Sequence, residues 1–242
     1  MANEPKIYFP EVGIHNKDLD ISSERLEKSK SYQDLSTIII CPTRGKIPAR
    51  VVQSWMGLMR PMNQKVIGPI FATNMEVGEA YNSLIESILA NPELSKWKYI
   101  LTIEEDNMPP ADGLLKLYES MDKYDVVQGI YWTKGEGGQP MIYGDPNVIP
   151  KNYIPQKPIG ETIQQCNGLG MGFNLFKLDI FKNKDLPKPW FKTFQGVIPG
   201  EGAKAYTQDL YFYENAAKLG YTFACDNRVK VGHYDYENDI VW

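Results

Sequence analysis

Short apolar runs alternate along the chain with longer segments in which apolar residues recur every three or four positions. The first run, Thr37-Ile38-Ile39-Ile40-Cys41, is an uninterrupted β-branched stretch of the kind buried on both faces of a parallel sheet. Three further apolar runs predict strands at Val66 to Ala72, Tyr99 to Ile103 and Val126 to Tyr131. The pattern therefore predicts a sheet that contains several parallel strands.

Helical periodicity fills the intervals between these runs. A helix is predicted from Pro48, a residue favoured at the first helical position, to about Met59. A second helix is predicted from Val77 to Ala90, and a third follows Pro110. Alternation of strands and helices in this order is typical of a Rossmann-like sheet.

The second half of the chain is less regular. The segment from Lys134 to Gly160 is rich in Gly, Pro and Asn, which predicts a loop or mobile flap. Beyond it we expect a strand at Phe173 to Phe176 and a helix near Asp209 to Leu219. Two short extended runs follow, Tyr221 to Cys225 and Val229 to Val231.

The beginning of the chain has a different pattern. A short extended piece, Lys6 to Phe9, precedes the polar segment Ser22 to Gln33, in which Ser23 could cap a small helix. We therefore expect an N-terminal appendage, residues 1–35, followed by a single domain, residues 36–242.

Composition limits the function classes. The content of 43% hydrophobic and 23% charged residues is that of an ordinary globular protein. A net charge of −4 gives no basic field that would attract phosphate backbones. The charge therefore does not support binding of a nucleic acid, including a modified nucleic acid. No apolar stretch approaches the roughly 18 residues of a membrane span, and the N-terminus lacks the order of a signal peptide. Together with three widely spaced cysteines, this predicts a cytoplasmic protein without a membrane span.

The most informative segment is Glu104-Glu105-Asp106-Asn107-Met108-Pro109-Pro110, which follows the predicted strand Tyr99 to Ile103. Two prolines forbid continuation of that strand, so three carboxylates lie at its carboxyl end, where open α/β sheets bind ligands. A divalent cation and a diphosphate could bind there. The alternative is a solvated acidic turn.

Other candidate segments each have a structural alternative. The turn Pro42-Thr43-Arg44-Gly45 ends the first strand, and Asn167 to Phe173 is rich in glycine but lacks the lysine of a nucleotide-triphosphate loop. Asp209 could be a general base or a helix cap. His233 could be a metal ligand, although a lone histidine is more often an ordinary hydrogen-bonded residue.

Taken in order, these segments resemble the GT-A glycosyltransferases, especially the inverting family-two type, over roughly Ser36 to His233. The resemblance implies an α/β GT-A fold, with a Rossmann-like mixed sheet flanked by helices. It also implies a metal-dependent enzyme that uses Mn²⁺ or Mg²⁺ and moves a sugar from a nucleotide-sugar donor to an acceptor hydroxyl, with inversion. A UDP-sugar is the expected donor, and a glycan, a small molecule or a protein the expected acceptor.

The same resemblance implies roles for individual residues. Asp106 and His233 are expected to hold the metal, and Asp209 to take the proton from the acceptor. Trp190 is expected to contact the acceptor. Donor binding is expected of Thr43, Arg44, Asn82, Glu104, Glu105 and Gly170.

Two departures from the family pattern keep other functions open. Glutamates stand at 104 and 105 where the family has aspartates, and Gln208 stands where glutamate is more common. These changes favour a non-catalytic sugar- or nucleotide-binding module of the same fold. A sugar-nucleotide nucleotidyltransferase is the other alternative, because Pro42 to Gly45 is similar to its glycine-arginine turn, although only Lys46 partly supplies the lysine of that class.

Overall fold

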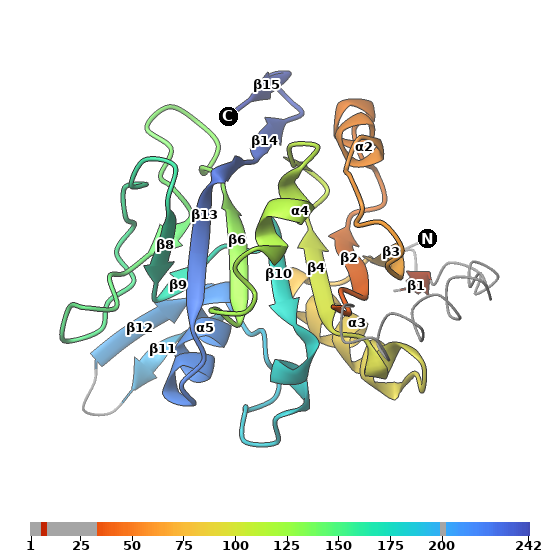
Figure 1. The fold of residues 1–242 in the computed structure, drawn as a ribbon. Coiled ribbons are helices and arrows are strands. Elements are labelled where there is room, and N and C mark those ends of the chain that lie inside the picture. Colours follow the sequence, from red (N-terminus) through yellow and green to blue (C-terminus); the bar gives the residue numbers. More distant parts are fainter. Residues whose placement is uncertain (1–5, 9–32, 199–201) are drawn as a thin grey trace.

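A mixed sheet of eight strands forms the centre of the molecule (Figure 1). The computed structural model describes residues 6–8, 33–198 and 202–242, so the helix expected after Ser22 lies outside the described residues. The strand order is β1-β3-β2-β4-β10-β6-β13-β8. The strands are β1 (Lys6–Tyr8), β2 (Thr37–Thr43), β3 (Val66–Thr73), β4 (Tyr99–Ile103), β6 (Val126–Ile130), β8 (Ile163–Cys166), β10 (Phe173–Lys177) and β13 (Phe223–Lys230).

Strand direction brings the candidate segments to one edge of the sheet. β2 is parallel to β3 and β4, and β6 is parallel to β13. β10 lies between β4 and β6 and is antiparallel to both, so these five strands all run in the same direction. Their carboxyl ends share the edge that is uppermost in Figure 1. β1, within the expected N-terminal appendage, pairs antiparallel with β3.

Helices cover both faces of this sheet. They are α2 (Ala49–Met56), α3 (Val77–Ala90), α4 (Gly113–Tyr118) and α5 (Gln208–Lys218), with 3₁₀ turns η2 (Leu94–Lys96) and η3 (Leu178–Lys182). Alternate residues of β2 point to opposite faces: Ile38 and Ile40 join the core against α3 and α5, whereas Ile39 and Cys41 join the core against α4. The predicted strand-helix alternation is confirmed. None of the helices in the described part of the chain combines the length and apolar character needed to cross a membrane.

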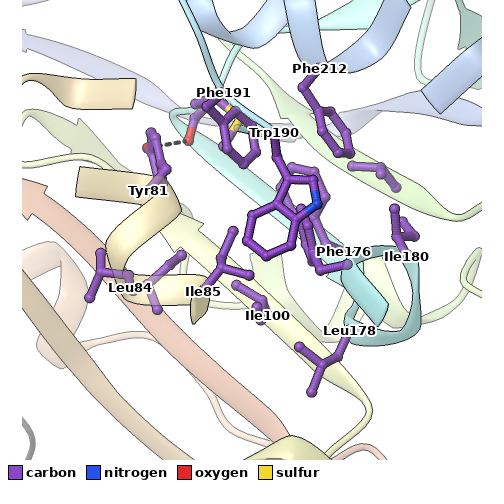
Figure 2. Close-up of a cluster of buried hydrophobic side chains, with 14 of the residues drawn as sticks. Tyr81, Leu84, Ile85, Ile100, Phe176, Leu178, Ile180, Trp190, Phe191 and Phe212 are labelled. Carbon is purple, nitrogen blue, oxygen red and sulfur yellow. Dashed lines mark hydrogen bonds between the residues drawn. The ribbon is translucent and has the colours of Figure 1, made fainter. Parts of the chain in front are cut away.

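The core against α3 and α5 contains a dense aromatic cluster (Figure 2). Trp190 is 1% exposed, and its ring centroid lies 5.3 Å from that of Phe181. Phe191 stacks on Phe212 at 4.9 Å. The acceptor contact predicted for Trp190 is therefore wrong, because the ring is packed inside the protein.

Small sheets that the sequence pattern did not predict surround the main sheet. β5 (Asn107–Met108), β14 (Gly232–Asp235) and β15 (Ile240–Val241) form a three-stranded sheet in the order β15-β14-β5. β7 (Ile142–Tyr143) pairs with β9 (Gly168–Leu169), and β11 (Phe194–Ile198) with β12 (Gly202–Tyr206). The first of these sheets brings the end of the chain to the carboxyl edge.

The first helix differs from its prediction. α2 ends at Met56 rather than near Met59, and Met56 is 83% exposed. α2 lies beyond the carboxyl edge of the sheet, where Trp55 Nε1 donates to the carbonyl of Asn107 at 2.8 Å and Ser54 Oγ to that of Pro109 at 2.9 Å. Its apolar residues therefore do not all face the sheet.

Candidate functional site

Two hollows flank the acidic segment at the carboxyl edge of the sheet. One, of about 460 Å³, lies between the turn after β2, the turn after β3 and residues 104–106. The other, of about 840 Å³, lies between the turn after β2, Asp106, the loop after β6 and residues 234–237. The acidic segment forms part of the wall of each hollow.

Strand pairing brings Asp106 and His233 together. β14 pairs with β5 so that His233 lies opposite Asn107, and the backbone N–H of Tyr234 donates to the carbonyl of Asp106 at 2.7 Å. His233 Nε2 then lies 3.4 Å from Asp106 Oδ2. Two residues far apart in sequence thus converge on one point.

The orientation of the His233 ring is fixed from its other side. Nδ1 lies 2.8 Å from the carbonyl oxygen of Trp132. Because a carbonyl only accepts, Nδ1 carries the hydrogen, and in the neutral ring the lone pair is on Nε2, which faces Asp106. A backbone contact of this kind commonly orients a metal-binding histidine.

The Asp106–His233 pair fits a divalent cation as two protein ligands. Ligands at about 2.1 Å from one ion and at right angles lie about 3 Å apart, close to the observed 3.4 Å. One carboxylate oxygen and one imidazole nitrogen suit Mn²⁺, and Mg²⁺-type sites are often completed by substrate phosphates and water. Among residues 6–8, 33–198 and 202–242, no group of three or more His, Cys, Asp or Glu side chains is arranged so that it could hold a metal ion.

Lys134 is a further residue at this point that sequence reasoning missed. Its Nζ lies 2.6 Å from Asp106 Oδ2, the oxygen that also faces His233. Burial alone would raise the pKa of Asp106, but hydrogen bonds and positive charge from a protonated His233 ring and from Lys134 outweigh it and hold that pKa below its ordinary value. The sequence feature that could have pointed to Lys134 is its position in a glycine-rich loop, directly after a predicted strand that ends at the same edge of the sheet.

Glu105 holds the turn after β2. Thr43 Oγ1 donates to Glu105 Oε2 at 2.6 Å, and the backbone N–H of Arg44 donates to the same oxygen at 2.8 Å. The Arg44 guanidinium donates to Oε1. The structure thus brings three residues expected to bind the donor together, with Glu105 as the brace of the turn.

Glu104 lines the smaller of the two hollows and not the larger one. The Tyr81 hydroxyl donates to its Oε1 at 3.1 Å. Burial, and then the negative charge of Asp106, raise the pKa of Glu104 to about 7. Its carboxyl group therefore keeps its proton to a higher pH than that of an ordinary glutamate.

Asp209 lies in the first turn of α5 and is 6% exposed. Its Oδ1 accepts hydrogen bonds from the Thr207 hydroxyl and from the backbone N–H of Leu210. Burial raises the pKa of Asp209, and its charge contributes to the raised pKa of Glu104, so the two carboxyl groups share one region. Because both hydrogen bonds fall on Oδ1, Oδ2 is the oxygen better placed to take a proton.

Two residues predicted to bind the donor, Asn82 and Gly170, have their closest contacts with the protein itself. Asn82 Nδ2 donates to the carbonyls of Gly78 and Phe191, and its Oδ1 accepts from the Phe191 N–H. These three contacts are all made to the protein backbone, so the prediction is corrected: the Asn82 side chain braces the loop before β11 on α3. At Gly170 a Cβ would overlap the Tyr131 hydroxyl, which explains the glycine; its donor contact stays a prediction.

Comparison with known proteins gives fold relationships without close sequence relatives. No family model and no curated protein matches the chain. A crystal structure of A197 from STIV superposes with a TM-score of 0.59 at 17% identity, covering 85% of this chain and 92% of that one. GalNAc-T7, solved with UDP, GalNAc and Mn²⁺, superposes with a TM-score of 0.55 at 8% identity.

The chain covers 59% of GalNAc-T7, and 96% of this chain takes part in that superposition. TarS of S. aureus is a further match, with a TM-score of 0.46 at 13% identity. Likeness at such identities concerns the fold, which agrees with the strand order and with the position of the acidic segment. The protein therefore has the GT-A glycosyltransferase fold, the α/β architecture that its motifs implied.

Proposed function

We propose that the protein is a divalent-cation-dependent glycosyltransferase that moves a sugar from a nucleotide-sugar donor to an acceptor hydroxyl, with inversion. The observation that carries the proposal is the approach of Asp106 Oδ2 and His233 Nε2 to 3.4 Å at the carboxyl edge of the sheet. Glycosyl transfer needs positive charge at the leaving diphosphate and a base at the acceptor, and the site offers candidates for both.

Asp106 and His233 would hold the divalent cation, which when bound stabilises negative charge on the departing diphosphate. The turn braced by Glu105 borders both hollows beside the acidic segment, so Thr43 and Arg44 are in position to contact the nucleotide. UDP is the first nucleotide to test, because GalNAc-T7 was solved with UDP and Mn²⁺.

Asp209 is the proposed base. Its carboxylate takes the proton from the acceptor hydroxyl while the acceptor oxygen forms a bond to the anomeric carbon. The bond from that carbon to the diphosphate oxygen breaks on the opposite side, and its electron pair leaves with the nucleoside diphosphate. Asp209 lies on α5, whereas Asp106 lies in the turn between β4 and β5 and His233 lies on β14, and a base separate from the metal ligands agrees with inversion.

The direct test is incubation with a panel of UDP- and GDP-sugars, with Mn²⁺ or with EDTA. We expect release of nucleoside diphosphate and free sugar from one donor, dependent on the cation and lost in Asp106→Asn. Asp179→Asn is the matched control, because this 78% exposed carboxylate lies on η3, at the opposite edge of the sheet. Donor binding without turnover would favour the non-catalytic module instead.

The nucleotidyltransferase alternative predicts a different product. That class would form a sugar nucleotide from a sugar phosphate and a nucleoside triphosphate, with release of pyrophosphate. Here the guanidinium of Arg44 is paired with Glu105, which supports a role in holding the turn. Pyrophosphate release in the same panel, with nucleoside triphosphate added, would favour this alternative.

A further inference from the structure

One cation of the protein itself already contacts the proposed metal ligand. Lys134 Nζ lies 2.6 Å from Asp106 Oδ2, and the Lys134 side chain is 32% exposed. His233 Nε2 approaches the same oxygen. The ammonium group therefore occupies part of the space next to Oδ2 that a divalent ion would need.

The loop after β6 is built to present Lys134. The N–H of Thr133 donates to the carbonyl of Gln139 at 2.9 Å, and the N–H of Gln139 donates to Thr133 Oγ1 at 2.8 Å. Gly135 and Gly137 have φ of 100° and 76°, which let the chain turn sharply between these contacts. The loop is thus a closed turn with the lysine near its start.

The same loop also orients the histidine. The carbonyl of Trp132, two residues before Lys134, accepts from His233 Nδ1. One short stretch of chain therefore directs Nε2 toward Asp106 and places an ammonium on the carboxylate. The same loop therefore orients the His233 ring and neutralises the charge of Asp106.

An ammonium and a divalent ion cannot share one carboxylate oxygen at contact distance without strong repulsion. The lysine stem is flexible, so the ammonium can leave Asp106 without a change of backbone. The 840 Å³ hollow that Lys134 lines also contains the carboxylates of Glu105, Asp235 and Glu237, and an anion bound beside Asp106 would be a further partner for the displaced ammonium.

We propose that Lys134 competes with the divalent cation for Asp106 and, when displaced or when no metal is bound, contacts the diphosphate of the nucleotide. The competition concerns only the protein and the ion, whereas the diphosphate contact rests on the proposed function. Lys134 is thus a built-in counter-cation that neutralises Asp106 in the empty site and adds positive charge beside the leaving group.

The test measures Mn²⁺ and nucleotide separately. Binding of Mn²⁺ alone is followed by the electron paramagnetic resonance signal of the free ion, and binding of UDP in EDTA by titration calorimetry. In Lys134→Met we expect Mn²⁺ to bind about three- to tenfold more tightly and UDP without metal to bind about three- to tenfold more weakly. Lys134→Arg, which keeps the charge, should show little gain in Mn²⁺ affinity.

Two control variants distinguish the loss of a direct contact to Asp106 from the loss of a positive charge in general. Lys46→Met removes a positive charge from the same hollow without removing a contact to Asp106, and Lys182→Met removes one at the opposite edge. Both should change Mn²⁺ affinity less than Lys134→Met does.

Mn²⁺ affinity that is unchanged or weaker in Lys134→Met, or equally tightened in Lys46→Met, would overturn the competition. Metal-free UDP affinity that does not fall would overturn the diphosphate contact. If the wild type binds no nucleotide in any condition, the proposed function fails, but tighter Mn²⁺ binding in Lys134→Met would still support the competition.

Discussion

Asp106 is the residue on which most of the site converges, and its neighbours come from two distant parts of the chain. His233 arrives through β14, and Lys134 arrives through the loop after β6. The sequence identified Asp106 because it ends an acidic triplet after a buried strand. Lys134 belongs to no recognised sequence motif, so its place in the site is shown only by its contact with Asp106.

Replacement of Asp106 by Asn should abolish cation-dependent nucleotide binding. An amide oxygen carries no charge, so the site loses the anionic ligand that pairs with His233. We expect the affinity for UDP to be the same with Mn²⁺ as with EDTA, measured by titration calorimetry. Asp179→Asn should keep the difference between the two conditions, whereas a preserved difference in Asp106→Asn would mean that the cation binds elsewhere.

Replacement of Asp209 by Asn should leave donor binding intact and slow transfer by about 10²–10⁴-fold, the usual effect of losing a general base. The amide oxygen still accepts from the Leu210 N–H, so α5 keeps its first turn. Transfer rate and UDP affinity are measured on the same preparation. Full activity would show that Asp209 serves only as a helix-terminal acceptor.

The raised pKa of Asp209 also predicts a pH dependence. The base acts only when deprotonated, so transfer should fall as the pH drops through a value above that of an ordinary aspartate. Burial penalises the charged form in the folded state, so above this pKa the wild type gives up folding stability that Asp209→Asn retains. Urea unfolding at pH 5 and pH 8 should show a larger stability gain for the variant at pH 8.

At the scale of elements, a bulge in β13 decides where His233 goes. Asp226 pairs with Gly129 and Lys230 with the next residue, Ile130, so β13 has three extra residues at this point. The irregular strand turns toward β5, where β14 begins. Periodicity predicted two separate runs here, because the bulge interrupts the apolar pattern within what is a single strand.

Replacement of Gly129 by Ala should disturb this arrangement. A Cβ there would lie 2.7 Å from side-chain carbons of Val229 and Val231 and 3.0 Å from the Val229 carbonyl oxygen. We expect a loss of about 1–3 kcal/mol in the free energy of unfolding, typical of overpacking, together with weaker Mn²⁺ binding through a shifted His233.

Chemical denaturation and Mn²⁺ titration check this prediction. Gly57→Ala is the matched control, since a Cβ there comes no closer than 3.4 Å to another atom and the backbone is right-handed helical. If Gly129→Ala were as stable as wild type, the valines could give way and the bulge would not depend on the glycine.

At the scale of the whole molecule, two cores fix the sheet between its helices. Aromatic side chains gather on the α3 and α5 face, and Trp190 lies among them (Figure 2). Lys188 Nζ lies 4.5 Å from the centre of the Trp190 ring, so a cation covers the ring on the outer side. Among the described residues no group accepts the indole N–H.

Replacement of Trp190 by Ala should therefore lower stability by about 3–5 kcal/mol, as expected for a large buried aromatic side chain. Trp190→Phe should cost much less, because it fills most of the volume and removes an unpartnered N–H. Guanidinium unfolding gives both values. A stable Trp190→Ala with a raised acceptor KM would restore the acceptor role that burial argues against.

Local pattern predicted the main strands and the four helices, with α2 shorter than predicted, because burial on a sheet imposes a period of about two and burial on a helix a period of 3.6. The predictions that failed concern the roles of single side chains, which hydrophobic periodicity does not determine. A tryptophan such as Trp190 can stack on a sugar or pack in the core, and the sequence does not distinguish these roles. An asparagine such as Asn82 can likewise bind a ligand or make a structural hydrogen bond. Burial and hydrogen bonding decide such cases, and neither is local.

The sequence by itself determined the alternation of strands and helices, the acidic segment at the end of β4 and its place at the carboxyl edge of the sheet. These follow from contacts within a few residues and from prolines that end a strand. Only the tertiary structure decided that β14 pairs with β5, that His233 therefore meets Asp106, and that Lys134 shares the same oxygen. The physical reason is that such contacts depend on strand order, on one bulge and on loop closure over distances that no local period encodes.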